Sequence, residues 1–122
     1  IENPLSLVAA HAAYTAGHEW LDQMTTYLDK NFVFVSEYLK EHLPKAIHTI
    51  PAAMYLMWID LSFYFSVGEN LTLYFANEAG VLLEGGDMFV DNADGFIRLN
   101  LACPRAKVEE GLRRICKATL RE

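Results

Sequence analysis

The sequence predicts an α+β domain, or α/β in looser usage, in which a small mixed sheet carries packed helices. Three observations lead to this fold class. Residues 5–42 have the apolar spacing of long helices, residues 46–102 contain short segments of strand character, and residues 106–120 return to helical spacing. The length of 122 residues is that of one domain.

The first predicted helix spans residues 5–16. Asn3 is a favourable N-cap, Pro4 suits the first helical position, and Gly17 is expected to interrupt the helix. Its residues are apolar almost all round, which is typical of a helix covered on several sides. Since so small a domain cannot surround its own end, we expect a partner that is missing here. The chain also begins without methionine, so we expect it to be a piece of something longer.

A second helix is predicted for residues 18–42, because apolar residues recur there at spacings of three and four. It must end before Pro44. At about 1.5 Å per residue this helix is roughly 37 Å long, close to the diameter expected for the whole domain. It is therefore expected to connect two bodies.

The rest of the chain alternates strands and helices. A helix is predicted over 69–78, closed by Gly80. A loop is predicted over 84–95, in which Gly85 and Gly86 are expected to form a turn with positive φ. Residues 63–67 suit a strand or a loop. Four strands are predicted, at 46–50, 54–61, 81–83 and 95–102. The final helix, 106–120, is expected to point four residues inward: Val108, Leu112, Ile115 and Cys116.

Composition excludes several classes of function. The net charge of −6 argues against nucleic-acid binding, and the chain contains neither a membrane span nor a signal-peptide pattern. The four histidines lack metal-ligand spacing, so no metal is expected. Cys103 and Cys116 are expected to be reduced thiols of a cytoplasmic protein.

One charged residue, Arg98, stands in the middle of an apolar strand. Because successive side chains of a strand alternate faces, Ile97, Leu99 and Leu101 are expected in the core, and Arg98 and Asn100 on the opposite face. A guanidinium that loses water without gaining a partner is destabilising by several kcal/mol. Arg98 should therefore hold a carboxylate.

That carboxylate has two possible sources. It can belong to this chain, in which case Arg98 forms an internal ion pair. Alternatively it belongs to a ligand, which the two-pronged guanidinium holds with help from Asn100. The candidate internal partners are Asp60, Asp87 and Asp94.

Four stretches in order resemble one enzyme family. They are residues 3–39, "YLMWID" at 55–60, "AGVLLEGGDMF" at 79–89 and "GFIRLNLACPR" at 95–105. Together they resemble the carboxyl-terminal region of pyridoxal-phosphate (PLP) enzymes of the class I/II aminotransferase superfamily, fold type I, closest to the cystathionine β-lyase-like C–S lyases. The resemblance covers essentially the whole chain. It implies that Arg98 binds the α-carboxylate of an L-amino-acid substrate, and that segment 84–89 lies near the active-site entrance.

The resemblance also implies that most of the enzyme is missing. None of the five lysines stands in the family's Schiff-base motif, so no catalytic or cofactor-binding residue is expected in this chain. Residues 1–17 are expected to pack on the absent PLP-binding large domain, and residues 18–122 to form an aminotransferase-like small domain. The parent is expected to be a cytoplasmic, homodimeric aminotransferase or C–S lyase that uses PLP. The chain alone should bind no PLP and be inactive.

Two other functions remain open. The chain could be a free-standing module that binds amino acids through Arg98. It could also be an interaction domain whose apolar first helix mediates association, with Arg98 paired internally.

Overall fold

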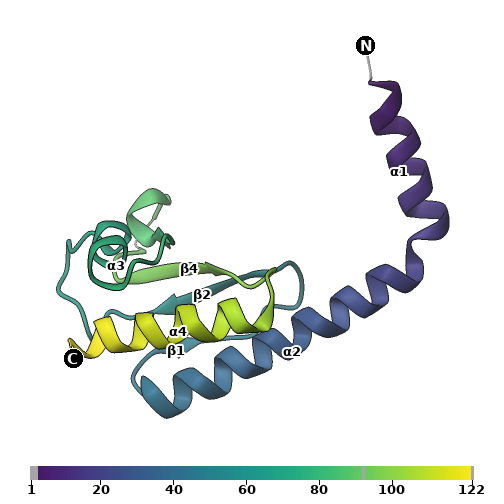
Figure 1. Ribbon diagram of the computed structural model, residues 1–122. Helices are drawn as coiled ribbons and strands as arrows, with labels where there is room; N and C mark the ends of the chain where they lie inside the picture. The colour runs from purple at the N-terminus through teal and green to yellow at the C-terminus, as the bar shows by residue number, and fades with distance from the viewer. Residues whose placement is uncertain (1–2, 92, 122) are drawn as a thin grey trace.

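The computed structural model describes residues 3–91 and 93–121. Ile1 and Glu2 of the predicted first segment, Asn92 of the predicted loop, and Glu122 lie outside the described residues. The α+β class is confirmed, with helices packed on a small sheet (Figure 1). In chain order the elements are α1 (Pro4–Ala16), α2 (His18–His42), β1 (Ile47–His48), β2 (Leu56–Asp60), α3 (Leu71–Ala79), β3 (Glu84–Gly85), the 3-10 turn η1 (Gly86–Met88), β4 (Phe96–Asn100) and α4 (Arg105–Leu120).

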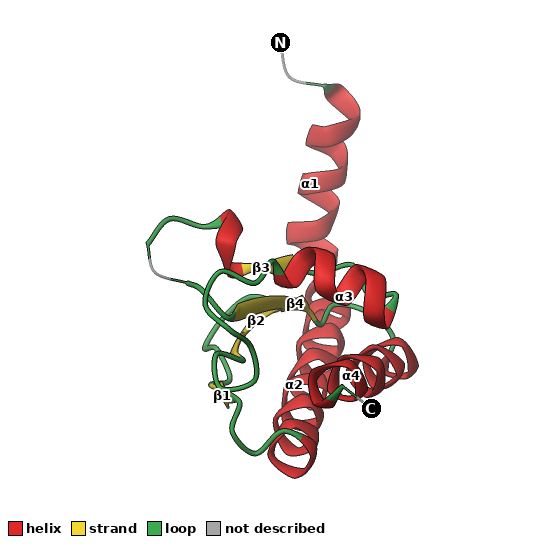
Figure 2. Ribbon diagram, turned by 90° about the vertical axis from the view of Figure 1, so that its left-hand side faces the viewer, coloured by secondary structure: helices red, strands yellow, loops and turns green. Residues whose placement is uncertain are grey.

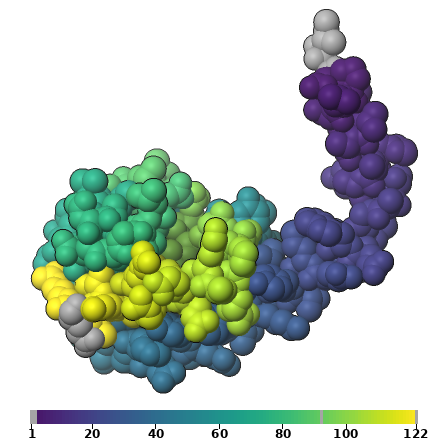
Figure 3. Space-filling model, viewed as in Figure 1, coloured from purple at the N-terminus to yellow at the C-terminus, as the bar shows by residue number. Residues whose placement is uncertain are grey.

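Helix α1 forms as its caps predict. The Asn3 side chain accepts a hydrogen bond from the Leu5 amide at 3.0 Å, and the Gly17 amide donates to the Ala13 carbonyl at 3.0 Å. The helix projects away from the body of the molecule (Figures 1 and 3). None of its residues is buried, so its apolar side chains are exposed on all sides.

Helix α2 has the predicted bounds and joins α1 to the body. Its buried residues all lie in the second half, where Phe32, Val35 and Leu39 enter the core. Trp20 and Leu21, in the first half, are exposed. The buried residues of this helix are therefore confined to residues 31–39.

The sheet has the order β1-β2-β4-β3, and each of the three strand pairs is antiparallel, where a mixed sheet was expected. The reason lies in the connection between β2 and β4. The chain leaves β2 at Asp60 and returns beside it, because Asp60 pairs with Phe96 and the Leu61 amide donates to the Gly95 carbonyl at 2.8 Å. A strand that re-enters at the end where its neighbour stopped must run the opposite way.

Two local predictions are wrong around β3. The strand lies at Glu84–Gly85 and not at 81–83, and the two glycines do not form a turn with positive φ, since φ of Gly85 is −78° and positive φ occurs elsewhere among the described glycines. Gly86 is required instead because there is no room for a side chain at this position. A Cβ there would lie 1.7 Å from the Ala93 carbonyl oxygen, closer than any atom can approach.

The core lies between one face of the sheet and helices α2 and α4 (Figures 1 and 2). The inner face of the sheet is formed by four buried residues, Met57, Ile59, Ile97 and Leu99. The four residues predicted to point inward from α4 are all buried. Burial raises the pKa of the Cys116 thiol to about 11, so this cysteine is an inert core residue.

Within the described part of the chain, no helix is both long enough and apolar enough to cross a membrane.

The core also encloses one side of a histidine. His48 Nε2 lies 2.9 Å from the Ser36 hydroxyl, and its Nδ1 is buried without a hydrogen-bond partner. A proton added at Nδ1 would therefore find no acceptor. Burial, with a smaller contribution from the charge of Lys40, lowers the pKa of the His48 imidazole.

We expect this histidine to make stability depend on pH. Because its pKa is lower in the folded state than the ordinary value of about 6.5, the unfolded chain takes up the proton first as the pH falls. The free energy of unfolding should therefore decline from about pH 7 downwards. Urea titrations between pH 7.5 and 5 should show a shallower decline for His48→Gln, which keeps an amide beside Ser36. Equal slopes for the two proteins would contradict this account.

Candidate functional site

The side of the sheet facing away from α2 and α4 carries a row of three side chains. Strand pairing places Arg98 of β4 between Trp58 of β2 and Glu84 of β3. Because their strand neighbours fill the core, these three side chains point the other way. The predicted alternation of β4 is confirmed, and the row defines an outer face that none of the described α-helices covers (Figure 2).

Arg98 is held on this face by two neighbours. Its Nη2 donates to the Glu84 carboxylate, and its guanidinium lies over the Phe89 ring, 4.8 Å from the ring centroid. Its Nε is buried and has no hydrogen-bond partner. The Arg98 and Glu84 side chains are 25% and 42% exposed, so the ion pair borders solvent.

The internal partner differs from the three aspartates expected. Asp60 instead accepts from the Ser62 amide at 2.8 Å, Asp94 from the Gly68 amide at 3.0 Å, and Asp87 lies 3.4 Å from the Asn70 side-chain nitrogen. Glu84 was missed because the predicted strand stopped at residue 83. Correct placement of β3 puts Glu84 directly opposite Arg98.

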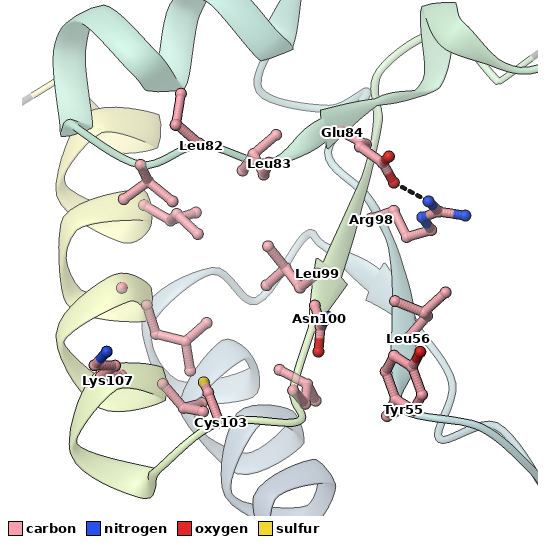
Figure 4. Close-up of a pocket in the computed structure, with 16 residues that line it drawn as sticks. Tyr55, Leu56, Leu82, Leu83, Glu84, Arg98, Leu99, Asn100, Cys103 and Lys107 are labelled. Atoms are coloured by element: carbon pink, nitrogen blue, oxygen red, sulfur yellow. Dashed lines mark hydrogen bonds and ion pairs between the residues drawn. The ribbon is translucent and has the colours of Figure 1, made fainter. Parts of the chain in front are cut away.

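Beside Arg98 the surface is hollowed into a pocket of about 580 Å³. It lies between segment 81–84, β4 and α4 (Figure 4). The pairing of β3 with β4 ends at Arg98, so β4 continues past it with an open edge toward the pocket. The Arg98–Glu84 pair stands at one end of the pocket, and Lys107 of α4 stands at the opposite side.

Asn100, the second predicted binding residue, is exposed and lines the same pocket. It lies two positions after Arg98 and therefore shares its face of β4. Its side-chain oxygen accepts from the Ala102 amide at 2.9 Å and helps to end the strand. The structure thus brings Asn100 beside Arg98 and also gives it a local structural role.

A buried asparagine that the sequence analysis passed over fixes the corner after β4. Asn31 of α2 donates from Nδ2 to the carbonyls of Leu101 at 2.9 Å and Cys103 at 3.1 Å, and its Oδ1 accepts from Arg105 Nε at 2.8 Å. The Arg105 amide also donates to the Tyr27 hydroxyl at 2.7 Å. The only sign of this role in the sequence was that Asn31 is a polar residue on the apolar side of a predicted helix.

The residues present do not form a complete site for PLP. All five lysines are exposed, whereas a lysine that forms a Schiff base must lie in an enclosed site with the cofactor. Lys107 is the one lysine among the described pocket residues, and it stands across the pocket from Arg98. No group of three or more metal-ligating side chains occurs in residues 3–91 and 93–121. Among the described residues, Arg98 is thus a candidate for binding an anion, and no lysine is enclosed as a Schiff-base lysine would be.

Known proteins resemble this chain over nearly its whole length. It is 38% identical over 118 residues to cystathionine β-lyase PatB of Bacillus subtilis, covering 97% of this chain and 30% of the relative. It is 33% identical over 109 residues to the protein MalY of Escherichia coli, covering 88% of this chain and 28% of that protein. No family model matches.

Solved structures agree with these relatives. The PLP-bound C–S lyase of Staphylococcus hominis superposes with a TM-score of 0.94 at 45% identity, over 98% of this chain and 32% of that one. The homologues are thus cystathionine β-lyases and PLP-bound C–S lyases. The chain spans about 30% of the curated relatives' length, as expected for a small domain of a fold type I PLP enzyme.

Proposed function

We propose that this chain is the carboxyl-terminal small domain of a PLP-dependent C–S lyase acting on L-amino acids, and that Arg98 binds the substrate's α-carboxylate. The observation that carries the proposal is the placement of Arg98. A permanently charged guanidinium lies on the outer face of the sheet beside a pocket, over the Phe89 ring and with its buried Nε without a hydrogen-bond partner. The identity to lyases over nearly all of the chain supports the reaction class.

In this role Arg98 positions the substrate. A carboxylate can accept two parallel hydrogen bonds from a guanidinium, which fixes both its place and its orientation. The Asn100 side-chain amide, on the same face, is a further donor within this site. PLP supplies the electron sink for bond cleavage, and the residues that hold it belong to the remainder of the parent.

We further propose the predicted division of the chain. Residues 1–17 pack on the large domain, and residues 18–122 form the small domain. The exposed apolar surface of α1 supports this, since it includes Leu5, Val8 and Tyr14 and no residue of α1 is buried. The cytoplasmic location and the homodimer of the parent stay predictions.

The test compares the full-length parent protein with the isolated 122-residue chain. With added PLP and L-cystathionine, we expect the parent to release a thiol, measured with a thiol reagent, together with a 2-oxo acid. The isolated chain should release neither, because its lysines are exposed and lie outside a complete site. Transamination without thiol release would replace the lyase by an aminotransferase. Turnover by the isolated chain would contradict the proposed division of labour.

A further inference from the structure

We infer that Glu84 is an internal competitor for the carboxylate site of Arg98, and that displacing it allows the substrate to bind more tightly. This inference rests on the proposed function of Arg98 and concerns how that site is occupied before substrate arrives. It starts from which part of the guanidinium Glu84 uses. The Glu84 carboxylate accepts from Nη2 of Arg98.

Nη2 is the nitrogen that a bidentate ligand cannot avoid. A guanidinium offers a carboxylate two edges with parallel N–H groups, one formed by Nε and Nη2 and the other by Nη1 and Nη2. Both edges include Nη2. Nη2 carries one N–H group on each edge, so Glu84 occupies one of the two edges. A second carboxylate would have to bind at the other edge, where the two negative charges would repel each other.

Register and packing determine which partner can move. Glu84 lies directly opposite Arg98 in the β3–β4 pairing, and the Gly85 amide beside it donates to the Thr72 hydroxyl at 2.9 Å. The backbone of Glu84 is thus fixed. Its side chain is 42% exposed, whereas Arg98 is 25% exposed and lies on Phe89. Rotation of the Glu84 side chain into solvent frees Nη2 without disturbing the arginine.

The buried Nε supports the same conclusion. It is next to Nη2 on the side edge of the guanidinium, yet it has no acceptor while Glu84 is bound. A carboxylate that takes both Nε and Nη2 would satisfy it. Glu84 therefore leaves part of the guanidinium unsatisfied, and a substrate carboxylate that satisfies both nitrogens can replace it.

The expected consequence is a raised KM for the substrate. The apparent affinity for the substrate is the intrinsic affinity multiplied by the fraction of molecules in which Arg98 is free of Glu84. A partly exposed ion pair reduces that fraction by about two- to fivefold. In the full-length parent, Glu84→Gln should lower KM for L-cystathionine by about this factor, with kcat little changed. The same variant should leave KM for the methyl ester of the substrate unchanged, because the ester lacks the competing carboxylate.

Glu110→Gln is the matched control. Glu110 also pairs with arginines, Arg113 and Arg114, and is similarly exposed, but it lies on α4 outside the pocket. Its replacement should change neither kinetic constant. A KM for Glu84→Gln that is unchanged or higher, while Arg98→Ala still weakens binding, would overturn the competition and leave the proposed function standing. If Arg98→Ala itself does not alter KM, the proposed function fails and the competition fails with it.

Discussion

Replacing Arg98 by alanine in the full-length parent is expected to lower kcat/KM for L-cystathionine by about 100-fold. The estimate follows from two charge-assisted hydrogen bonds, which together contribute about 3 kcal/mol, at about 1.4 kcal/mol per tenfold change in rate. Arg98→Lys should recover only part of the loss, since an ammonium is a point charge without the planar pair of donors. Steady-state kinetics with the three proteins measures both effects.

A measurement of the free energy of unfolding distinguishes the loss of kcat/KM in Arg98→Ala from damage to the fold. The ion pair with Glu84 borders solvent, so losing it should reduce the free energy of unfolding by about 1 kcal/mol or less. Arg113→Ala removes an arginine of similar charge from the exposed surface of α4 and should leave kcat/KM unchanged. If Arg98→Ala keeps kcat/KM within twofold of the wild type, Arg98 serves only its internal ion pair.

The largest expected loss of stability follows from Asn31→Leu. Asn31 is fully buried, with 0% exposure, and it satisfies two backbone carbonyls and one arginine. Leucine has a similar volume but no polar atoms, so these three partners would lose their hydrogen bonds inside the protein. At about 1–3 kcal/mol for each buried group left unsatisfied, we expect a loss of about 3–5 kcal/mol, measured by urea unfolding.

Asn77→Leu provides the control for this substitution. Asn77 lies on the exposed side of α3, so the same chemical change should alter the free energy of unfolding by about 0.5 kcal/mol or less. A loss below about 1 kcal/mol for Asn31→Leu would show that water or local movement satisfies the three groups. The hydrogen bonds of Asn31 would then not be what fixes the corner after β4.

The helices could be predicted because their signals are local. Asn3 and Pro4 start α1, the break at Gly17 separates it from α2, and Gly80 closes α3 with φ of 61°. Each of these signals acts within a few residues of the helix end. The periodicity of α4 likewise identified its buried side, because spacing along a helix determines which residues share a face.

The errors concern features that depend on distant parts of the chain. The two-residue strand β3 is defined by its pairing with β4, so the apolar pattern of 81–83 placed it too early and hid the Glu84–Arg98 pair. Gly86 is required by the Ala93 carbonyl, which approaches from across the loop. Asn31 contacts residues about 70 positions away, and periodicity that counts only apolar residues gives it no weight. The sequence therefore predicted Arg98 and Asn100 as candidate site residues but not the Glu84 partner of Arg98.

The most direct test of the central claim combines the removal of Arg98 with the removal of the charge on the substrate's α-carboxylate. In the full-length parent, kcat/KM is measured for L-cystathionine and for an ester of its α-carboxylate, with wild-type protein and with Arg98→Ala. We predict that the wild type prefers the acid by about 100-fold and that the variant loses nearly all of this preference, because the two changes remove the same interaction. An equal preference in both proteins would mean that another group binds the carboxylate, and it would contradict the role of Arg98.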